Sequence, residues 1–73
     1  MLDDMERKGR HEYQPNDMLT KVQLAAALNV SSRTIDRWIE TGEAPPYVRL
    51  PRNRLRWKWA DVLVWLEARR EGG

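Results

Sequence analysis

The stretch from Val30 to Gly42, VSSRTIDRWIETG, most constrains the fold of this 73-residue chain. Ser31 is a favourable helix N-cap, because its hydroxyl accepts a hydrogen bond from an amide of the first turn. Gly42 is a favourable stop, since the residue that follows a helix often adopts a left-handed backbone. The pattern therefore predicts a short helix between these two residues.

This predicted helix has one apolar face and one cationic face. Ile35, Trp38 and Ile39 follow the i, i+3, i+4 spacing of a buried stripe. At ~100° per residue, Arg33 and Arg37 lie roughly 160° and roughly 200° from Ile35, on the opposite side of the helix. The helix is then either a recognition helix that presents two arginines or a structural helix whose charged face is solvated. The neighbouring segments distinguish these two interpretations.

A further helix is predicted immediately before this one, over Lys21–Leu28. Thr20 suits its N-cap, and Gln23 completes a capping box three residues later. Asn29 breaks the helix, since asparagine tolerates the left-handed conformation better than most residues. A helix, a short turn and a helix make a helix-turn-helix.

The segment after Gly42 predicts a β-hairpin. Tyr47–Leu50 and Leu55–Trp59 are β-prone, and the tight turn Pro51–Arg54 lies between them, with Asn53 expected to take a positive φ. The second strand alternates between an apolar and a basic face, with Leu55, Trp57 and Trp59 on one side and Arg54, Arg56 and Lys58 on the other. Because an isolated hairpin is unstable, its tryptophan face must pack on the helices.

The last predicted helix is Ala60–Arg70, with Val62, Trp65 and Leu66 facing inward. The fold class is then mainly α with a small β-hairpin: a winged helix-turn-helix with three helices and a two-stranded wing over residues 18–70. Residues 1–17 are expected to form a flexible tail, ordered at most by packing of Tyr13, and residues 71–73 a frayed C-terminus.

Catalysis is not expected from this composition. The chain has no cysteine, and its single histidine, His11, lies in the tail. Ser31 and Ser32 have no base nearby in sequence. We therefore predict that the chain is not an enzyme and that it uses no metal, no cofactor and no small-molecule substrate.

The longest apolar run, Val62–Leu66, is too short to cross a bilayer, and no signal peptide is visible, so no membrane partner is expected.

The charge distribution indicates a polyanionic partner. Net charge is only +2 at pH 7, yet the segment from Ala44 to Ala60 contains five bases and no acid. In a helix-turn-helix, the start of the second helix enters the major groove of double-stranded DNA, where arginine pairs with guanine. The candidate recognition-helix contacts are Ser31, Ser32, Arg33, Thr34 and Arg37. The candidate wing contacts, to the backbone or an adjacent minor groove, are Arg49, Arg52, Asn53, Arg54, Arg56 and Lys58.

The run Leu19–Arg69 resembles the excisionase (Xis) family and related MerR-type winged-helix domains. The matching elements are the opening Leu-Thr, the core Val-Ser-x-Arg-Thr-Ile-x-Arg-Trp-Ile, the exit Gly-x-x-Pro, the basic wing and the closing Asp-Val-x-x-Trp-Leu. Asn29 departs from the family, which often has glycine there. The resemblance implies a recombination directionality factor in the cytoplasm of a bacterial host, at the nucleoid. Such a protein binds and bends phage attachment-site DNA, associates cooperatively with further copies along the DNA, and helps integrase to excise the prophage.

Two other functions remain open at this point. A small phage or prophage transcriptional regulator would use the same surface, although regulators of this fold often add a dimerisation or effector domain that these residues do not supply. A protein-interaction adaptor would instead bind an acidic partner through the basic face. Binding to random and attachment-site DNA separates these possibilities.

Overall fold

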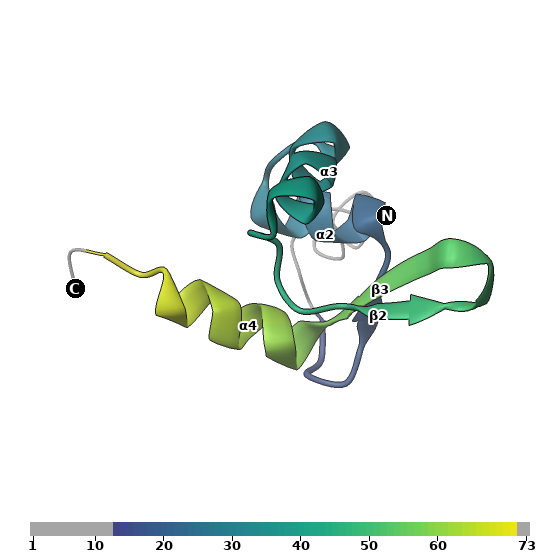
Figure 1. The fold of residues 1–73 in the computed structure, drawn as a ribbon. Coiled ribbons are helices and arrows are strands. Elements are labelled where there is room, and N and C mark those ends of the chain that lie inside the picture. The colour runs from purple at the N-terminus through teal and green to yellow at the C-terminus, as the bar shows by residue number, and fades with distance from the viewer. Residues whose placement is uncertain (1–12, 72–73) are drawn as a thin grey trace, which may run out of the picture.

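The computed structural model describes residues 13–71, in which three helices pack with a small antiparallel sheet (Figure 1). The elements are β1 (Met18–Leu19), α2 (Lys21–Leu28), α3 (Ser32–Thr41), β2 (Val48–Leu50), a 3₁₀ turn (Pro51–Asn53), β3 (Arg54–Lys58) and α4 (Trp59–Ala68). The predicted winged helix-turn-helix is confirmed.

Side-chain caps mark the starts of α2 and α3, and residues with a left-handed backbone mark their ends. The hydroxyl of Thr20 accepts from the amide of Gln23 at 3.1 Å, and the Gln23 side chain accepts from the Thr20 amide at 2.9 Å. The hydroxyl of Ser31 accepts from an amide in the first turn of α3 at 3.1 Å. The chain leaves α2 at Asn29 with φ 60° and leaves α3 at Gly42 with φ 80°. The predicted limits of both helices are therefore confirmed.

The sheet is organised around β3, which lies between β1 and β2. The paired residues of β2 and β3 are Val48 with Arg56, Arg49 with Leu55, and Leu50 with Arg54, and those of β1 and β3 are Met18 with Lys58 and Leu19 with Trp57. β1 was not predicted, because two residues are too few to show an alternating pattern. Its pairing ties the wing to the start of the helix-turn-helix.

The predicted strand Leu55–Trp59 is wrong at its end, since Trp59 is the first residue of α4. The segment before β1 causes this change. The amide of Trp59 donates to the carbonyl of Asp17 at 2.9 Å, and the amide of Ala60 donates to the carbonyl of Pro15 at 3.0 Å. These carbonyls satisfy donors that the first turn of a helix leaves without partners.

Residues 13–17 are therefore attached to the domain through the start of α4. The ring of Tyr13 packs on Trp59 with a centroid distance of 5.4 Å, as the sequence allowed for Tyr13. The rest of the predicted tail, residues 1–12, and the last part of the predicted frayed terminus, residues 72–73, lie outside the described residues. α4 ends at Ala68, earlier than predicted, and Arg69 is its C-cap.

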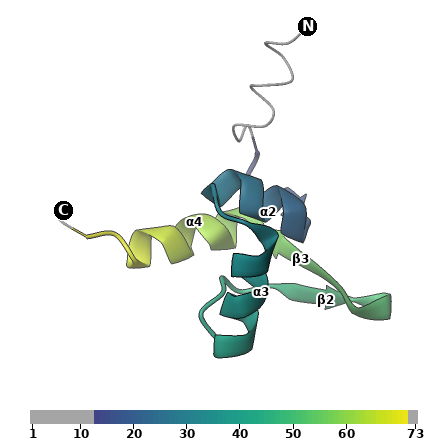
Figure 2. The same cartoon turned by 90° about the horizontal axis from the view of Figure 1, so that it is seen from above.

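The core lies where β1, β3 and the starts of the helices meet. Its buried members are Leu19, Leu24, Ala25, Ile35, Trp57, Trp59 and Val62. Trp57 is completely buried, and its indole Nε1 donates to the carbonyl of Pro45 at 3.2 Å. Leu66, predicted to face inward, is instead 38% exposed. The contacts between α4 and the end of α3 are made by Trp65 and Arg69, and they leave Leu66 at the edge of the packed face. Figure 2 shows α4 extending to the side opposite to the β2–β3 hairpin.

Candidate nucleic-acid interface

α3 presents its two arginines to solvent. Arg33 and Arg37 are both exposed, whereas Ile35 on the opposite side of the helix is buried. Trp38 and Ile39 are partly buried and pack against the core. The predicted phase of this helix is therefore confirmed, and its outer surface is available to a ligand.

The polar residues at the start of α3 are engaged in its cap. The hydroxyls of Ser31 and Thr34 lie 3.0 Å apart, and the amide of Thr34 donates to the Ser31 hydroxyl. Ser31 is exposed, whereas Ser32 and Thr34 are partly buried. Each hydroxyl oxygen carries two acceptor lone pairs, so a DNA contact from Ser31 or Thr34 would share the hydroxyl with the cap.

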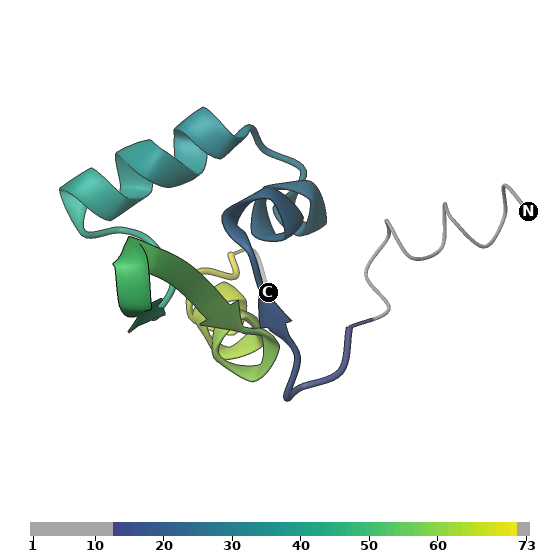
Figure 3. The same ribbon diagram turned by 90° about the vertical axis from the view of Figure 1, so that its right-hand side faces the viewer.

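The end of α3 is attached to α4. The carbonyl of Glu43 accepts from the indole of Trp65 at 3.2 Å and from the guanidinium of Arg69 at 3.1 Å. Arg69 also lies over the Trp65 ring, 4.5 Å from its centroid, and Trp65 packs on Trp38 at 5.6 Å. Arg69 thus has a structural role, and these contacts join the end of α3 to α4. Figure 3 shows α3 along its length, with α4 seen nearly end-on below it.

The tip of the wing contains two adjacent residues with left-handed backbone. Asn53 has φ 61°, as predicted, and Arg52 has φ 68°, which was not predicted. Both side chains are exposed. The Asn53 side-chain oxygen accepts from Arg49 Nη1 at 3.3 Å, a contact that links the tip to β2.

The wing strands divide the predicted basic residues between two faces. In an antiparallel sheet, directly paired residues share a face and successive residues alternate. Arg54, Arg56 and Lys58 therefore lie on one face of β3. Arg49 pairs with Leu55 and lies on the other face. The structure thus brings together three of the predicted strand cations and separates Arg49 from them.

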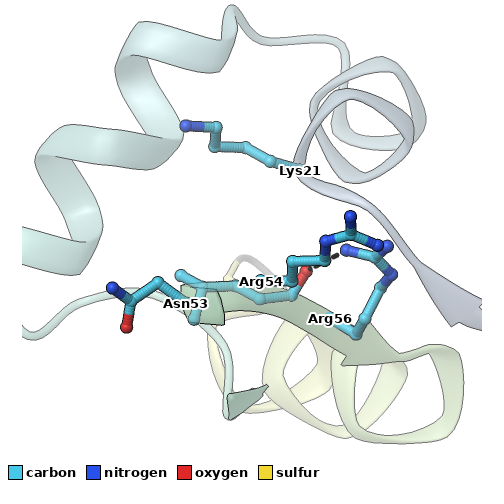
Figure 4. A pocket seen from close by; sticks show the side chains of 5 residues that line it. Lys21, Asn53, Arg54 and Arg56 are labelled. Carbon is cyan, nitrogen blue, oxygen red and sulfur yellow. Dashed lines mark hydrogen bonds between the residues drawn. The ribbon is translucent and has the colours of Figure 1, made fainter. Parts of the chain in front are cut away.

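A cleft of about 220 Å³ lies between the start of α2 and β3 (Figure 4). The residues that line it are Lys21, Asn53, Arg54, Leu55 and Arg56. Lys21 also reaches α3, where its Nζ lies 2.7 Å from Asp36 Oδ1. Lys21 therefore connects the surface of α3 with the basic face of β3.

Sequence reasoning did not identify Lys21 as a candidate. In the sequence it is only the first residue of a helix, far from the basic residues of the wing. One local signal was present, since the macrodipole of a helix disfavours a cation in the first turn. A lysine at that position is stabilised by an acidic partner outside its own helix, here Asp36.

Among residues 13–71, there is no group of three or more histidine, cysteine, aspartate or glutamate side chains that could hold a metal ion. In the same range, there is no helix with both the length and the apolar character needed to cross a membrane.

Comparison with known proteins identifies one family. Residues 18–70 match the model of the family described as "Helix-turn-helix domain". Neither a curated protein nor a solved structure matches the chain. The matched residues contain all three helices and the complete sheet of the described part of the chain.

Proposed function

Because this chain belongs to the helix-turn-helix domain family, we propose that it binds double-stranded DNA sequence-specifically. In this proposal, α3 enters the major groove and the β2–β3 hairpin follows the adjacent backbone or minor groove. The observation that carries the proposal is the presence of exposed cations on both the helix and the wing. Arg33 and Arg37 are exposed on α3, and Arg54, Arg56 and Lys58 share one face of β3.

The dimensions of DNA agree with a reading role for α3. The major groove is ~12 Å wide and admits a helix, and its edges distinguish all four base pairs. Arg33 and Arg37 are four residues apart, which places them on neighbouring turns of the same exposed face. A guanidinium at either position has the planar fork that pairs with O6 and N7 of guanine.

A mobility-shift experiment tests DNA binding and base reading together. Arg37→Ala should cost ~1–3 kcal/mol on attachment-site DNA and should relax its sequence preference. Arg70→Ala is the matched control, because Arg70 is an exposed arginine beyond the end of α4. An equal loss on every sequence would contradict base reading by Arg37. Absence of a shift at low salt would contradict DNA binding and favour the adaptor function.

The biological role that we propose is that of an excisionase, or recombination directionality factor. Its support is the resemblance of Leu19–Arg69 to that family in the motifs of the helix, the exit and the closing helix and in the basic character of the wing. A helix and a wing that contact successive grooves would hold the DNA at two places. Bending a short site costs ~1–6 kcal/mol, which such contacts would offset. Integrase and further copies of this chain along the DNA are the proposed partners.

An in vitro excision assay tests this role. It uses integrase and a substrate that carries the two attachment sites found at the ends of an integrated prophage. Excision that depends on this protein would support the proposal. DNA binding without any effect on excision, together with altered transcription from a neighbouring promoter, would contradict it and favour the regulator.

A further inference from the structure

We infer that the cleft between the start of α2 and β3 seats one phosphate of the DNA backbone, and that Lys21 binds this phosphate together with Arg54 and Arg56. The inference rests on the proposed DNA binding and deepens it. It adds Lys21, which lies outside both the recognition helix and the wing, to the residues that contact DNA. It also assigns Lys21, Arg54 and Arg56 to the same phosphate.

The three cations come from two segments of the chain and line the same cleft. Figure 4 shows Arg54 and Arg56 side by side on the side of β3 that faces α2, and Lys21 on the opposite wall with its ammonium turned away from them toward α3. The described lining of the cleft contains no carboxylate, since its other members are Asn53 and Leu55. Neighbouring guanidinium groups repel each other, and a bound anion would relieve that repulsion.

A hydrogen bond to the backbone orients the guanidinium of Arg56 and leaves its other donors unused in that bond. Arg56 is partly buried, and its Nη1 donates to the carbonyl of Leu55 at 2.8 Å. A guanidinium has five N–H donors, so this single bond fixes its position and leaves donors for an anion. Arginine in this arrangement matches the geometry of phosphate oxygens.

Lys21 is able to turn from Asp36 to the cleft. The Lys21 side chain is 41% exposed, and its ammonium bonds to one Asp36 oxygen at 2.7 Å. Because this ion pair is solvent-exposed, it adds little stability, and breaking it costs little. In the inferred complex the flexible Lys21 side chain turns from Asp36 toward the cleft, where its ammonium meets the phosphate that Arg54 and Arg56 bind.

The decisive test is a double variant with unchanged net charge, Lys21→Gln/Asp36→Asn. The affinity for a short, fluorescently labelled DNA duplex of mixed sequence is measured by anisotropy over a series of salt concentrations. Because Arg54 and Arg56 still contact the phosphate, this variant should reduce the slope of log K against log [salt] by only part of the ~0.9 that loss of a whole phosphate contact would cost. Since the net charge is the same as in the wild type, a change in overall charge does not explain a smaller slope.

Two single variants and a combined variant complete the test. Arg56→Gln should also reduce the slope by part of this amount, because it removes a second ligand of the same phosphate. A combined variant, Lys21→Gln/Asp36→Asn/Arg54→Gln/Arg56→Gln, should reduce the slope by about 0.9 in all, because the three cations share one phosphate. Arg70→Gln removes one positive charge beyond the end of α4, away from the cleft, and should leave the slope unchanged. Circular dichroism checks that each variant is folded at the temperature of the titration.

The outcomes distinguish this inference from the proposed function. If the wild type binds the duplex and the combined variant without Lys21, Arg54 and Arg56 keeps the same slope, the cleft does not seat a phosphate, although DNA binding stands. A fall in slope for Arg70→Gln as large as that for Arg56→Gln would also overturn the inference. If the wild type does not bind the duplex at low salt, the proposed DNA binding itself is overturned.

Discussion

Replacing Trp57 with alanine should remove a large part of the stability of the domain, because this indole fills the centre of the core. Trp57 is 0% exposed, pairs with Leu19 of β1, and donates from Nε1 to the Pro45 carbonyl at 3.2 Å. Truncation of a buried tryptophan to alanine costs ~3–5 kcal/mol. A domain of this size has a free energy of unfolding of roughly 3 to 9 kcal/mol. The variant should therefore lose at least about a third of its free energy of unfolding.

Trp57→Phe separates packing from hydrogen bonding at the same position. Phenylalanine keeps most of the buried apolar surface but leaves the Pro45 carbonyl without its indole donor. An unsatisfied buried group of this kind costs ~1–3 kcal/mol, so this variant should fold with reduced stability. It should still bind DNA under conditions where it is folded, since Trp57 is buried and touches no ligand in the proposed complex.

Urea unfolding followed by far-ultraviolet circular dichroism measures both effects. Val64→Ala is the control, because Val64 is 68% exposed on α4 and its truncation should change the free energy of unfolding by less than about 0.5 kcal/mol. A Trp57→Ala variant that unfolds at the same urea concentration as the wild type would refute the placement of Trp57 at the centre of the core.

Three further predictions concern the wing, the end of α3 and its packing. Arg52→Ala should reduce the salt slope of DNA binding by about 0.9, and an unchanged slope would mean that the wing tip does not touch DNA. Gly42→Ala should lower the free energy of unfolding by ~1–2 kcal/mol, because φ is 80° although no atom lies within 4 Å of the added Cβ. Gly42→Asn should lose less in the same urea titration. Trp38→Ala should cost ~2 kcal/mol, less than Trp57→Ala, because Trp38 is only partly buried against Trp65. Equal losses for the two tryptophans would contradict this ranking.

The parts of the fold that were predictable depend on contacts between near neighbours in the sequence. Thr20 and Ser31 each accept from an amide three residues later. Asn29 and Gly42 adopt the left-handed backbone that their residue types favour. The directions of Arg33, Arg37 and Ile35 follow from the fixed rotation per residue of a helix. None of these features requires knowledge of the rest of the chain.

The errors arose where distant segments meet. β1 exists because Leu19 and Met18 pair with the end of β3, and Trp59 joins α4 because Asp17 and Pro15 supply carbonyls to its first turn. Leu66 lies on an inward stripe by periodicity, but the end of α3 covers the part of that stripe around Trp65 and Arg69 and leaves Leu66 38% exposed. Periodicity describes the face of a helix and does not say which part of that face its partner covers.

By itself, the sequence determined where α2 and α3 begin and end, which face of α3 is cationic, and that the segment around the wing is basic. Tertiary structure alone decided which of those charges lie together. The pairing register of β2 with β3 placed Arg49 away from Arg54 and Arg56, and the packing of α2 over β3 brought Lys21 beside them. The physical reason is the separation in sequence of the residues that interact. Caps and helix phase depend on residues within one or two helical turns. A shared cationic cleft requires a common core that holds together segments far apart in the chain.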